Sequence, residues 1–392
     1  MTPELLAELA SPAGQAVLDR AAGLAGDDPL AAASGLRGRG VGPDLAAAAL
    51  TQAALRARAA GKFGADAARM FFTRAGLEQA TRGPVAARRA TRLTTAGVRE
   101  IADLGCGIGA DSLAFARAGI RVRGVDADPL TVAVASLNAR ALGLESLIEV
   151  RCADAQDADL STVDGVFCDP ARRRGDARVF DPRSYTPPWD FVAGLPDRVP
   201  HTVLKLAPGI DHARIPPGTE AEWVSVDGEV VEAAFWCGPL AAVPRRATLL
   251  PSGASLVGSG TARAPVGPVR RYLYEPDGAV IRAHLVAEFA STVDGVLADP
   301  EIAYVYADSV VATPYARCYA VLDVLPFSVK RLRATLRERG VGRLTVKKRG
   351  SAVEPDELRR AMKLTGTGAA TVVLTRIAGA PSAILVERRD GG

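Results

Sequence analysis

The sequence has few of the residues that build metal centres or disulfide frameworks. Its 392 residues include five cysteines and three histidines, and no two cysteines form a C-x-x-C pair. Zinc sites and thiol-redox sites use such close spacings. We therefore expect no metal site. The thiols should be reduced and mostly buried, as in a cytoplasmic protein.

Long apolar runs are also missing. Runs such as Ala369–Leu374 end at Thr or Arg, far short of the roughly 20 residues that a bilayer-spanning helix needs. The first residues, Met-Thr-Pro-Glu, lack the basic start and apolar core of a secretory signal. The sequence thus predicts a cytoplasmic protein with no membrane segment.

The net charge is small but unevenly distributed. The whole chain carries +4, whereas residues 326–392 hold 15 Lys/Arg against six Asp/Glu, which gives +9 there and −5 for residues 1–325. A basic C-terminal module is typical of contact with a polyanion such as RNA. A sequence that simply uses Arg as its general surface residue would show the same excess.

The pattern of apolar residues divides the chain into three parts. Residues 1–95 are rich in Ala, Leu and Arg at helical spacing, which predicts a helical N-terminal region. Residues 96–245 alternate short apolar runs with helical patterns at 111–118 and 129–142, which is typical of an α/β domain with a parallel sheet. A Pro/Gly/Ser-rich stretch at 251–268 predicts a linker or a loop-rich join. Residues 246–392 have an α+β pattern, with helices predicted at 329–339 and 354–363.

A glycine-rich loop stands between a predicted strand and a predicted helix. Gly105, Gly107 and Gly109 let the backbone approach a ligand without a Cβ in the way. These glycines would also suit a dinucleotide. The flanking Asp103 and Asp111 decide between the two, because carboxylates repel a pyrophosphate but favour the sulfonium and ammonium of S-adenosylmethionine (SAM).

Three further acidic positions follow predicted strands in order. Asp126-Ala127 ends the second strand, where a carboxylate can accept both ribose hydroxyls of SAM, although it would serve a dinucleotide equally well. Asp154-Ala155 ends the third strand and could accept the adenine amine. Asp169-Pro170 ends the fourth, where the methyl group would be presented. Ligands of open parallel sheets bind beyond these carboxyl ends, so the ordered set favours SAM.

Residues 99–170 resemble the core of class I SAM-dependent methyltransferases. The whole chain is similar to actinobacterial methyltransferases that carry a C-terminal THUMP-like domain. The stretches that carry this likeness are Lys62–Gly64, Phe71–Thr81, Cys168–Arg172, Leu204–Asp211 and Leu273–Asp277. The resemblance implies a Rossmann-like seven-stranded core, SAM as cofactor and an RNA target, since THUMP domains accompany RNA-modifying enzymes. It also implies that the segment with Gln79 and Thr81 closes over the cofactor.

The motif at 169–172 suggests the acceptor chemistry. Methyltransferases of exocyclic base amines use an Asn/Asp-Pro-Pro-aromatic motif, of which Asp169 and Pro170 keep the acceptor half while Ala171-Arg172 replace the rest. Trp189, Phe191 or Arg172 could supply the missing stacking plane, although Trp189 and Phe191 could equally be core residues. We name Asp169, Pro170 and Arg172 as candidate catalytic residues.

Attack by a cysteine, as in uracil-C5 methyltransferases that also carry Asp-Pro-x-Arg, is disfavoured. Cys237 lies in a Phe-Trp-Cys-Gly-Pro context that differs from the expected one.

Basic residues supply candidate contacts to substrate. Arg173, next to Arg172 and Arg174, could hold RNA phosphates beside the methyl donor, or it could lie in a solvated loop. Lys205 follows another apolar run at a strand end. In the C-terminal module, Lys347-Lys348-Arg349 forms a basic strand end.

The sequence therefore predicts methyl transfer from SAM to a base nitrogen in structured RNA, a tRNA or an rRNA. A small-molecule or protein acceptor, and a non-catalytic RNA-binding protein with a vestigial SAM fold, stay open.

Overall fold

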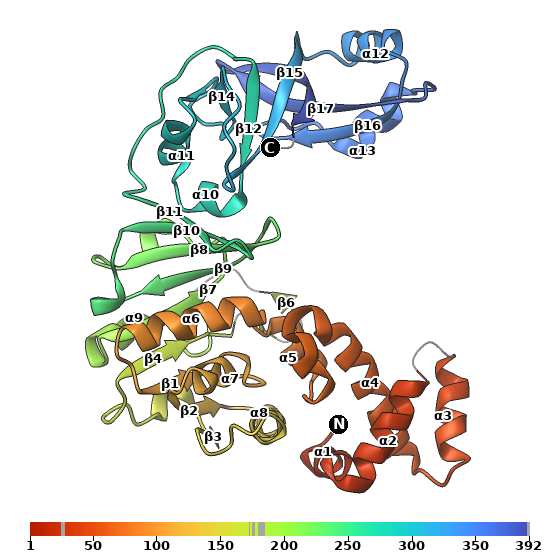
Figure 1. Ribbon diagram of the computed structural model, residues 1–392, viewed down its shortest axis with the longest axis vertical. Coiled ribbons are helices and arrows are strands. Elements are labelled where there is room, and N and C mark those ends of the chain that lie inside the picture. The colour runs from red at the N-terminus through yellow and green to blue at the C-terminus, as the bar shows by residue number, and fades with distance from the viewer. Residues whose placement is uncertain (25–27, 172, 175–176, 179–184, 390–392) are drawn as a thin grey trace. The chain divides into compact units, whose positions relative to one another are not determined.

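The computed structural model describes residues 1–392 except 25–27, 172, 175–176, 179–184 and 390–392. Residues 1–95 are helical, as predicted (Figure 1). Their helices are α1 (Pro3–Ala10), α2 (Pro12–Gly23), α3 (Pro29–Arg37), α4 (Pro43–Phe63), the 3-10 turn η1 (Gly64–Ala68), α5 (Arg74–Gln79) and α6 (Gly83–Thr95). Side chains of Thr2, Ser11, Asp28 and Thr73 accept hydrogen bonds from the first turns of α1, α2, α3 and α5, which explains where these helices begin.

Nine strands in the described residues form one sheet, in the order β11-β10-β8-β9-β7-β4-β1-β2-β3. The strands are β1 (Glu100–Leu104), β2 (Arg121–Asp126), β3 (Ile148–Cys152), β4 (Gly165–Cys168), β7 (His201–Leu206), β8 (Glu220–Val226), β9 (Glu229–Trp236), β10 (Arg245–Leu250) and β11 (Ala254–Gly258). Those from β1 to β9 provide the seven strands expected before residue 245. The other two, β10 and β11, extend the sheet, and β11 occupies part of the stretch predicted to be a linker.

Parallel pairing brings the predicted site residues to one edge of this sheet. β1 pairs in parallel with β2 and β4, β2 with β3, and β4 with β7. Leu104 therefore stands level with Val125 on one side and with Cys168 on the other. The helices between these strands are α7 (Ala110–Arg117), α8 (Pro129–Ala141) and α9 (Trp189–Arg198). The predicted helices at 111–118 and 129–142 are thus confirmed to within one residue.

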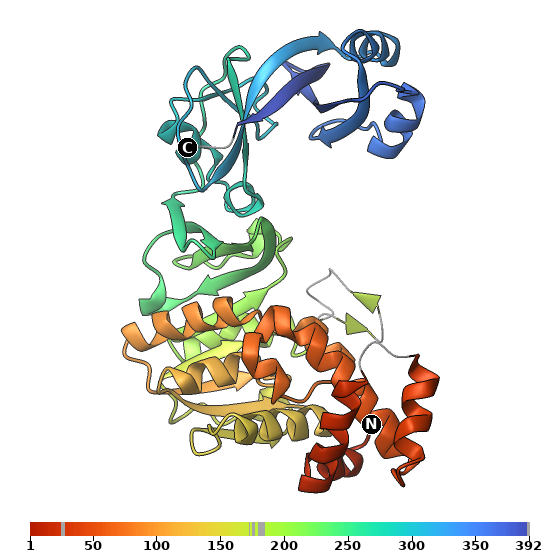
Figure 2. The same ribbon diagram turned by 45° about the vertical axis from the view of Figure 1, so that its right-hand side comes forward.

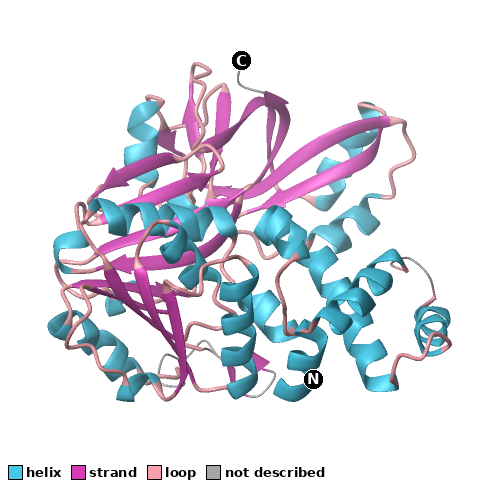
Figure 3. Cartoon of the chain, turned by 60° about the horizontal axis from the view of Figure 1, so that its bottom comes forward, coloured by secondary structure: helices cyan, strands magenta, loops and turns pink. Residues whose placement is uncertain are grey.

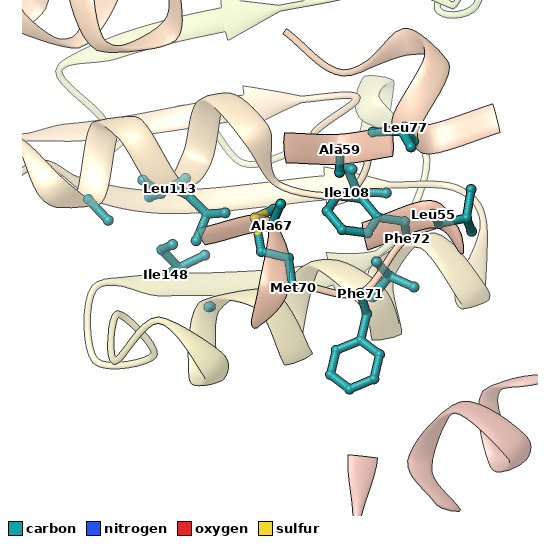
Figure 4. Packing of buried hydrophobic residues seen from close by; sticks show 14 of the residues in the cluster. Leu55, Ala59, Ala67, Met70, Phe71, Phe72, Leu77, Ile108, Leu113 and Ile148 are labelled. Atoms are coloured by element: carbon teal, nitrogen blue, oxygen red, sulfur yellow. The ribbon is translucent and has the colours of Figure 1, made fainter. Parts of the chain in front are cut away.

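The N-terminal helices and the first strands share one hydrophobic core. Figure 4 shows Met70, Phe71 and Phe72 from the segment after η1 beside Ile108 of the glycine-rich loop. The rings of Phe115 and Phe167 meet edge to face at 5.6 Å between centroids. Figure 3 shows the cyan helices around the N label and the magenta strands of the sheet. Packing thus joins the helical region to the residues that carry the candidate site.

The chain divides into two compact units, Met1–Leu206 with Ile210–Thr219 and Ala234–Ala242, and Ala207–Gly209 with Glu220–Ala233 and Val243–Gly392. Within the described residues, the second unit has a seven-stranded sheet in the order β13-β14-β12-β15-β18-β17-β16 (Figures 1 and 2; Figure 2 is the turned view). The predicted part boundaries after residues 95 and 245 stay predictions.

The second unit mixes strands and helices, as expected of an α+β module. Besides β8, most of β9, β10 and β11, its elements are β12 (Tyr272–Pro276), α10 (Gly278–Arg282), α11 (Val286–Thr292), β13 (Val296–Leu297), β14 (Val305–Ala307), β15 (Ala316–Pro326), α12 (Val329–Glu338), β16 (Val341–Lys348), α13 (Pro355–Met362), β17 (Gly368–Ile377) and β18 (Ala380–Arg389). Leu332 and Leu336 of α12 and Leu358 and Met362 of α13 form a core with strand residues such as Leu385.

Two negative findings concern the described residues alone. No helix there is long and apolar enough to cross a membrane. No group of three His, Cys, Asp or Glu side chains is placed to hold a metal ion in the same part of the chain.

Candidate functional site

The glycine-rich loop joins β1 to α7 and has a backbone that only glycine adopts easily. Gly105, Gly107 and Gly109 have φ angles of 80°, 56° and 86°, in the left-handed region that side chains disfavour. A Cβ on Gly105 would also lie 3.0 Å from the backbone oxygen of Asp169. The loop is therefore a close-fitting cradle beside the end of β4.

Asp126 holds this loop in place. Its Oδ2 accepts a hydrogen bond from the Gly107 amide at 3.0 Å, and its Oδ1 accepts one from the Asp128 amide at 3.0 Å. Burial raises the pKa of Asp126. Because a carboxylate offers about four lone-pair sites, two acceptor directions are left for other donors, such as a pair of ribose hydroxyls.

Asp103 lies buried at the end of β1 with an unused acceptor. Its Oδ2 accepts a hydrogen bond from Ser112, whereas its Oδ1 has no partner among the described residues. Burial, followed by the nearby Asp111, raises the pKa of Asp103 to about 8. A buried acceptor without a donor costs about 1–3 kcal/mol. An ammonium group would satisfy this oxygen and favour its charge, so these residues fit SAM.

Asp111 is engaged inside the protein. It forms an ion pair with Arg89, whose side chain is 2% exposed, and it accepts a hydrogen bond from Thr81 at 2.5 Å. The guanidinium of Arg89 also stacks on the ring of Phe167, 4.6 Å from its centroid. The sequence argument used Asp111 as a charge near the cofactor and Thr81 as a contact. In the structure both residues build a buried network behind the loop.

Asp169 forms an ion pair with Lys205. The two residues follow β4 and end β7, which pair in parallel with Cys168 level with Leu204. Lys205 is 8% exposed, whereas Asp169 is partly exposed and Pro170 is buried. Asp169, the carboxylate predicted from the motif, is therefore held by Lys205, which the sequence analysis also named as a candidate.

Asp154 lies at the end of β3. Its Oδ1 accepts a hydrogen bond from the amide of Gln156 at 2.8 Å, and the residue is exposed at the start of the 3-10 turn η2 (Ala155–Asp157). Asp126 stands next to it across the sheet, since it is level with Cys152. In strand order, the four carboxylates run Asp154, Asp126, Asp103, Asp169. Ala127 and Ala155 directly follow two of them.

Several candidates are not brought into this arrangement. Gln79 is exposed at the end of α5. Arg172 lies outside the described residues, and Arg173 is placed only by its backbone, in the short strand β5 (Arg173–Arg174). Trp189 and Phe191 open α9, with the guanidinium of Arg214 5.8 Å from the Trp189 ring and that of Arg198 5.8 Å from the Phe191 ring. Their contacts to substrate stay predictions.

Asn138 is a structural contributor that the sequence reading missed. Its side chain accepts the amide of Phe71 at 2.7 Å and donates to the backbone oxygens of Phe71 and Ile108 at 3.1 and 2.9 Å. It thereby ties the N-terminal helical region to the glycine-rich loop. A signal was present, because Asn138 stands on the apolar face of α8 with Val134 and Ala135, where a buried amide needs a partner.

Three of the thiols do not have the features of a nucleophile. Cys106, Cys168 and Cys237 are buried. Burial raises the pKa of all three thiols, for Cys237 to about 11. A thiol attacks as its thiolate, which burial disfavours. This agrees with the sequence argument against cysteine-mediated methylation.

Carboxylates accompany the basic strand end at 347–349. Lys347 forms an ion pair with Glu275 at 2.7 Å, and Lys348 forms one with Glu354 at 2.6 Å. Arg349 lies over the ring of Tyr304 at 5.0 Å and donates to the backbone oxygen of Ala303 at 3.3 Å. The strand end therefore offers less uncompensated charge than the sequence suggested.

Three family models match the chain. A methyltransferase domain matches residues 101–174, a THUMP domain-like model matches residues 316–388, and a domain of unknown function matches residues 2–59. The first match covers the glycine-rich loop and the four carboxylates.

Curated relatives extend this likeness over most of the chain. Two uncharacterized S-adenosylmethionine-dependent methyltransferases, from Mycobacterium tuberculosis strains CDC 1551 and H37Rv, are each 38% identical over 339 residues. The matches cover 82% of this chain and 90% of each relative. Among solved structures, a "putative methyltransferase" from Porphyromonas gingivalis W83 has the same fold, with a TM-score of 0.72, 20% identity, and coverage of 89% of this chain and 92% of that one.

Proposed function

Because the chain belongs to a family of class I SAM-dependent methyltransferases, we propose that it methylates a base nitrogen in structured RNA, a tRNA or an rRNA. The reaction class and the cofactor SAM follow from the family. The acceptor is our proposal. Its support is the THUMP domain-like match at residues 316–388, which lies almost wholly in the region of charge +9.

We propose that three of the four strand-end carboxylates bind SAM and that the fourth orients the acceptor. Asp103 would hold the ammonium of SAM, Asp126 its ribose hydroxyls, and Asp154 its adenine amine. The bound cofactor supplies an electrophilic methyl group. Glycines at 105, 107 and 109 leave room for close approach of the ligand to the backbone.

The Asp169–Lys205 pair is the observation that carries the proposed acceptor site. The Asp169 carboxylate, held by Lys205, would accept N–H hydrogen bonds from a base amine and so hold the nitrogen in one orientation. Methyl transfer depends mainly on such positioning, which can supply about 7–11 kcal/mol of a barrier. Pro170 fixes the backbone directly after the carboxylate. Arg172 and Arg173 are proposed to contact the RNA beside it.

Calorimetric titration with SAM, followed by incubation with methyl-labelled SAM and total RNA from a host strain lacking the gene, tests this function. We expect saturable binding and label in one RNA fraction. Label in protein or in small molecules, with none in RNA, would replace RNA as the acceptor. RNA binding without SAM binding would favour the vestigial enzyme.

A further inference from the structure

The C-terminal cations differ in whether they have acidic partners. Of the 15 Lys and Arg residues after position 325, six form ion pairs in the described structure: Arg339, Lys347, Lys348, Arg359, Arg376 and Arg389. Six other cations, which have no acidic partner in the same described part, lie on α12, on α13 or directly after α13. Charge available to a ligand therefore gathers on this helix pair.

The spacing along α12 places three of these cations on one side. Lys330, Arg333 and Arg337 follow each other at i, i+3 and i+7, which covers roughly 10 Å of helix axis. Leu332 and Leu336 are buried against the sheet. Arg331 is exposed on the same helix.

Two arginines of α12 reach across to α13. Arg333 donates to the backbone oxygen of Ala361 at 2.7 Å, and Arg337 donates to that of Lys363 at 3.0 Å. These oxygens lie at the end of α13, where cations are favoured by the helix dipole. Arg337 is exposed, so most of its five guanidinium donors stay available, whereas the Nε of Arg333 is buried. Arg360 and Lys363 are exposed at the same helix end.

We propose that the outer side of α12 and α13 binds the phosphate backbone of RNA. We name it the helical basic face, made of Lys330, Arg331, Arg333, Arg337, Arg360 and Lys363. The inference rests on the proposed RNA target. It places most of the phosphate contacts on α12 and α13, and fewer of them on the strand end at 347–349.

The composition of the helical basic face favours phosphates over a protein partner. Across the described residues of α12 and α13, only one large hydrophobic side chain is exposed, that of Val329 in the first turn of α12. Protein interfaces need such anchors at their centre, and reading of single-stranded bases needs stacking rings. Cations alone suit a phosphate backbone, whatever the base sequence.

Charge-matched variants test this assignment. Lys330→Ala/Arg331→Ala/Lys363→Asn removes three charges from the helical basic face and leaves the hydrogen bonds of Arg333 and Arg337 to α13 in place. Asn is chosen because Lys363 has a φ of 45°, which Asn tolerates. Lys347→Ala/Lys348→Ala/Arg349→Ala removes the same charge from the strand end. Fluorescence anisotropy with two labelled RNA hairpins of unrelated stem sequence, over a series of salt concentrations, gives the affinity and its salt slope.

We expect the helical variant to lose roughly tenfold or more in affinity for both hairpins. Its slope of log affinity against log salt should fall by about 3, near one unit for each lost phosphate contact. The strand-end variant should change less in both measures. Circular dichroism melts establish that both variants are folded.

Other outcomes overturn the inference. Equal losses in the two variants would mean that only net charge matters, and a larger loss in the strand-end variant would move the contact there. Binding of poly-glutamate as tight as that of RNA would assign the face to an acidic protein. If the unaltered protein binds neither hairpin nor total tRNA, the proposed RNA target itself fails, and this inference fails with it.

Discussion

Asp169 and Lys205 form an ion pair at the ends of two neighbouring parallel strands, β4 and β7, next to the glycine-rich loop. Only the Lys205 side chain is deeply buried there. Replacing Asp169 by Ala therefore acts twice, because it removes the proposed acceptor of the base amine and takes this carboxylate away from the buried ammonium of Lys205.

Asp169→Ala should abolish methyl transfer while SAM still binds. Loss of a positioned, charged hydrogen-bond partner reduces turnover by roughly 100- to 1000-fold. Asp169→Asn keeps the shape of the side chain and should therefore retain more activity than Asp169→Ala. Single-turnover transfer of labelled methyl groups measures the loss, and calorimetry with SAM is the control. Full activity of Asp169→Ala would show that the acceptor site lies elsewhere.

Asp126→Ala should weaken SAM binding. The change removes the proposed ribose acceptor and also the partner of the Gly107 amide, so the loop loses its anchor. We expect a loss of about 10- to 100-fold in affinity, since hydrogen bonds to charged groups contribute about 1.5–3 kcal/mol. Calorimetry measures it. Asp159→Ala, at an exposed carboxylate outside the site, is the matched control. Equal affinities would remove Asp126 from the SAM site.

SAM binding should release a proton at neutral pH. The pKa of Asp103 rises from 3.8 to about 8 through burial first and through Asp111 second, so the free protein holds Asp103 mostly protonated at pH 7. The cofactor's ammonium favours the carboxylate, and SAM affinity should therefore rise with pH and level off above about 8. Calorimetry in phosphate and in Tris counts the released proton by the difference in buffer ionisation heat.

The same shift predicts how the stability of the SAM-free protein depends on pH. Because the folded pKa lies above the unfolded one, the folded state binds the proton more tightly. The contribution of Asp103 to stability is complete below pH 3.8 and is lost as the pH rises to about 8. Asp103→Asn should remove both pH effects. If proton release persists in Asp103→Asn, another group is responsible.

The placement of these residues in the fold could be predicted from the sequence where its determinants are local. Short motifs reveal the glycines at 105, 107 and 109 and the acid at each strand end. Because parallel strands bring their carboxyl ends to the same edge of the sheet, no knowledge of tertiary contacts is needed to place these residues near one another. The pairs Arg89–Asp111 and Lys347–Glu275 join residues 22 and 72 positions apart. No periodicity reports such contacts, because they depend on tertiary packing.

For that reason the distribution of charge could be predicted only in part. The excess of +9 in the C-terminal module is a sum over the sequence, whereas the pairing of Lys347 with Glu275 and of Lys348 with Glu354 depends on the fold. RNA contact by the strand end at 347–349 stays a prediction. The helices α12 and α13 were both predicted from periodicity. Their contact through Arg333 and Ala361 was not, and that contact assembles the helical basic face.

The Arg89–Asp111 pair should be essential for folding stability. Arg89 is 2% exposed, and removal of one partner from a buried ion pair costs about 3–5 kcal/mol. Arg89→Met keeps the apolar volume and the packing on Phe167 but leaves Asp103 and Asp111 without their buried cation. Urea unfolding measures the loss, and Arg58→Ala, at an exposed position of α4, should stay within about 0.5 kcal/mol of the unaltered protein.

The double variant Arg89→Met/Asp111→Leu separates the charge from the packing. In Arg89→Met, Asp111 becomes an unpaired buried charge. If that charge causes the loss of stability, Asp111→Leu should restore most of it, because replacing a whole buried pair by apolar groups is often neutral or stabilising. Thr81 would lose its acceptor, at a cost of about 1 kcal/mol. SAM affinity in the double variant then reports whether the pair also serves the site. Unchanged affinity would mean that the network supports only the fold, whereas a loss in a protein of restored stability would show that Arg89 also tunes the charge of Asp103.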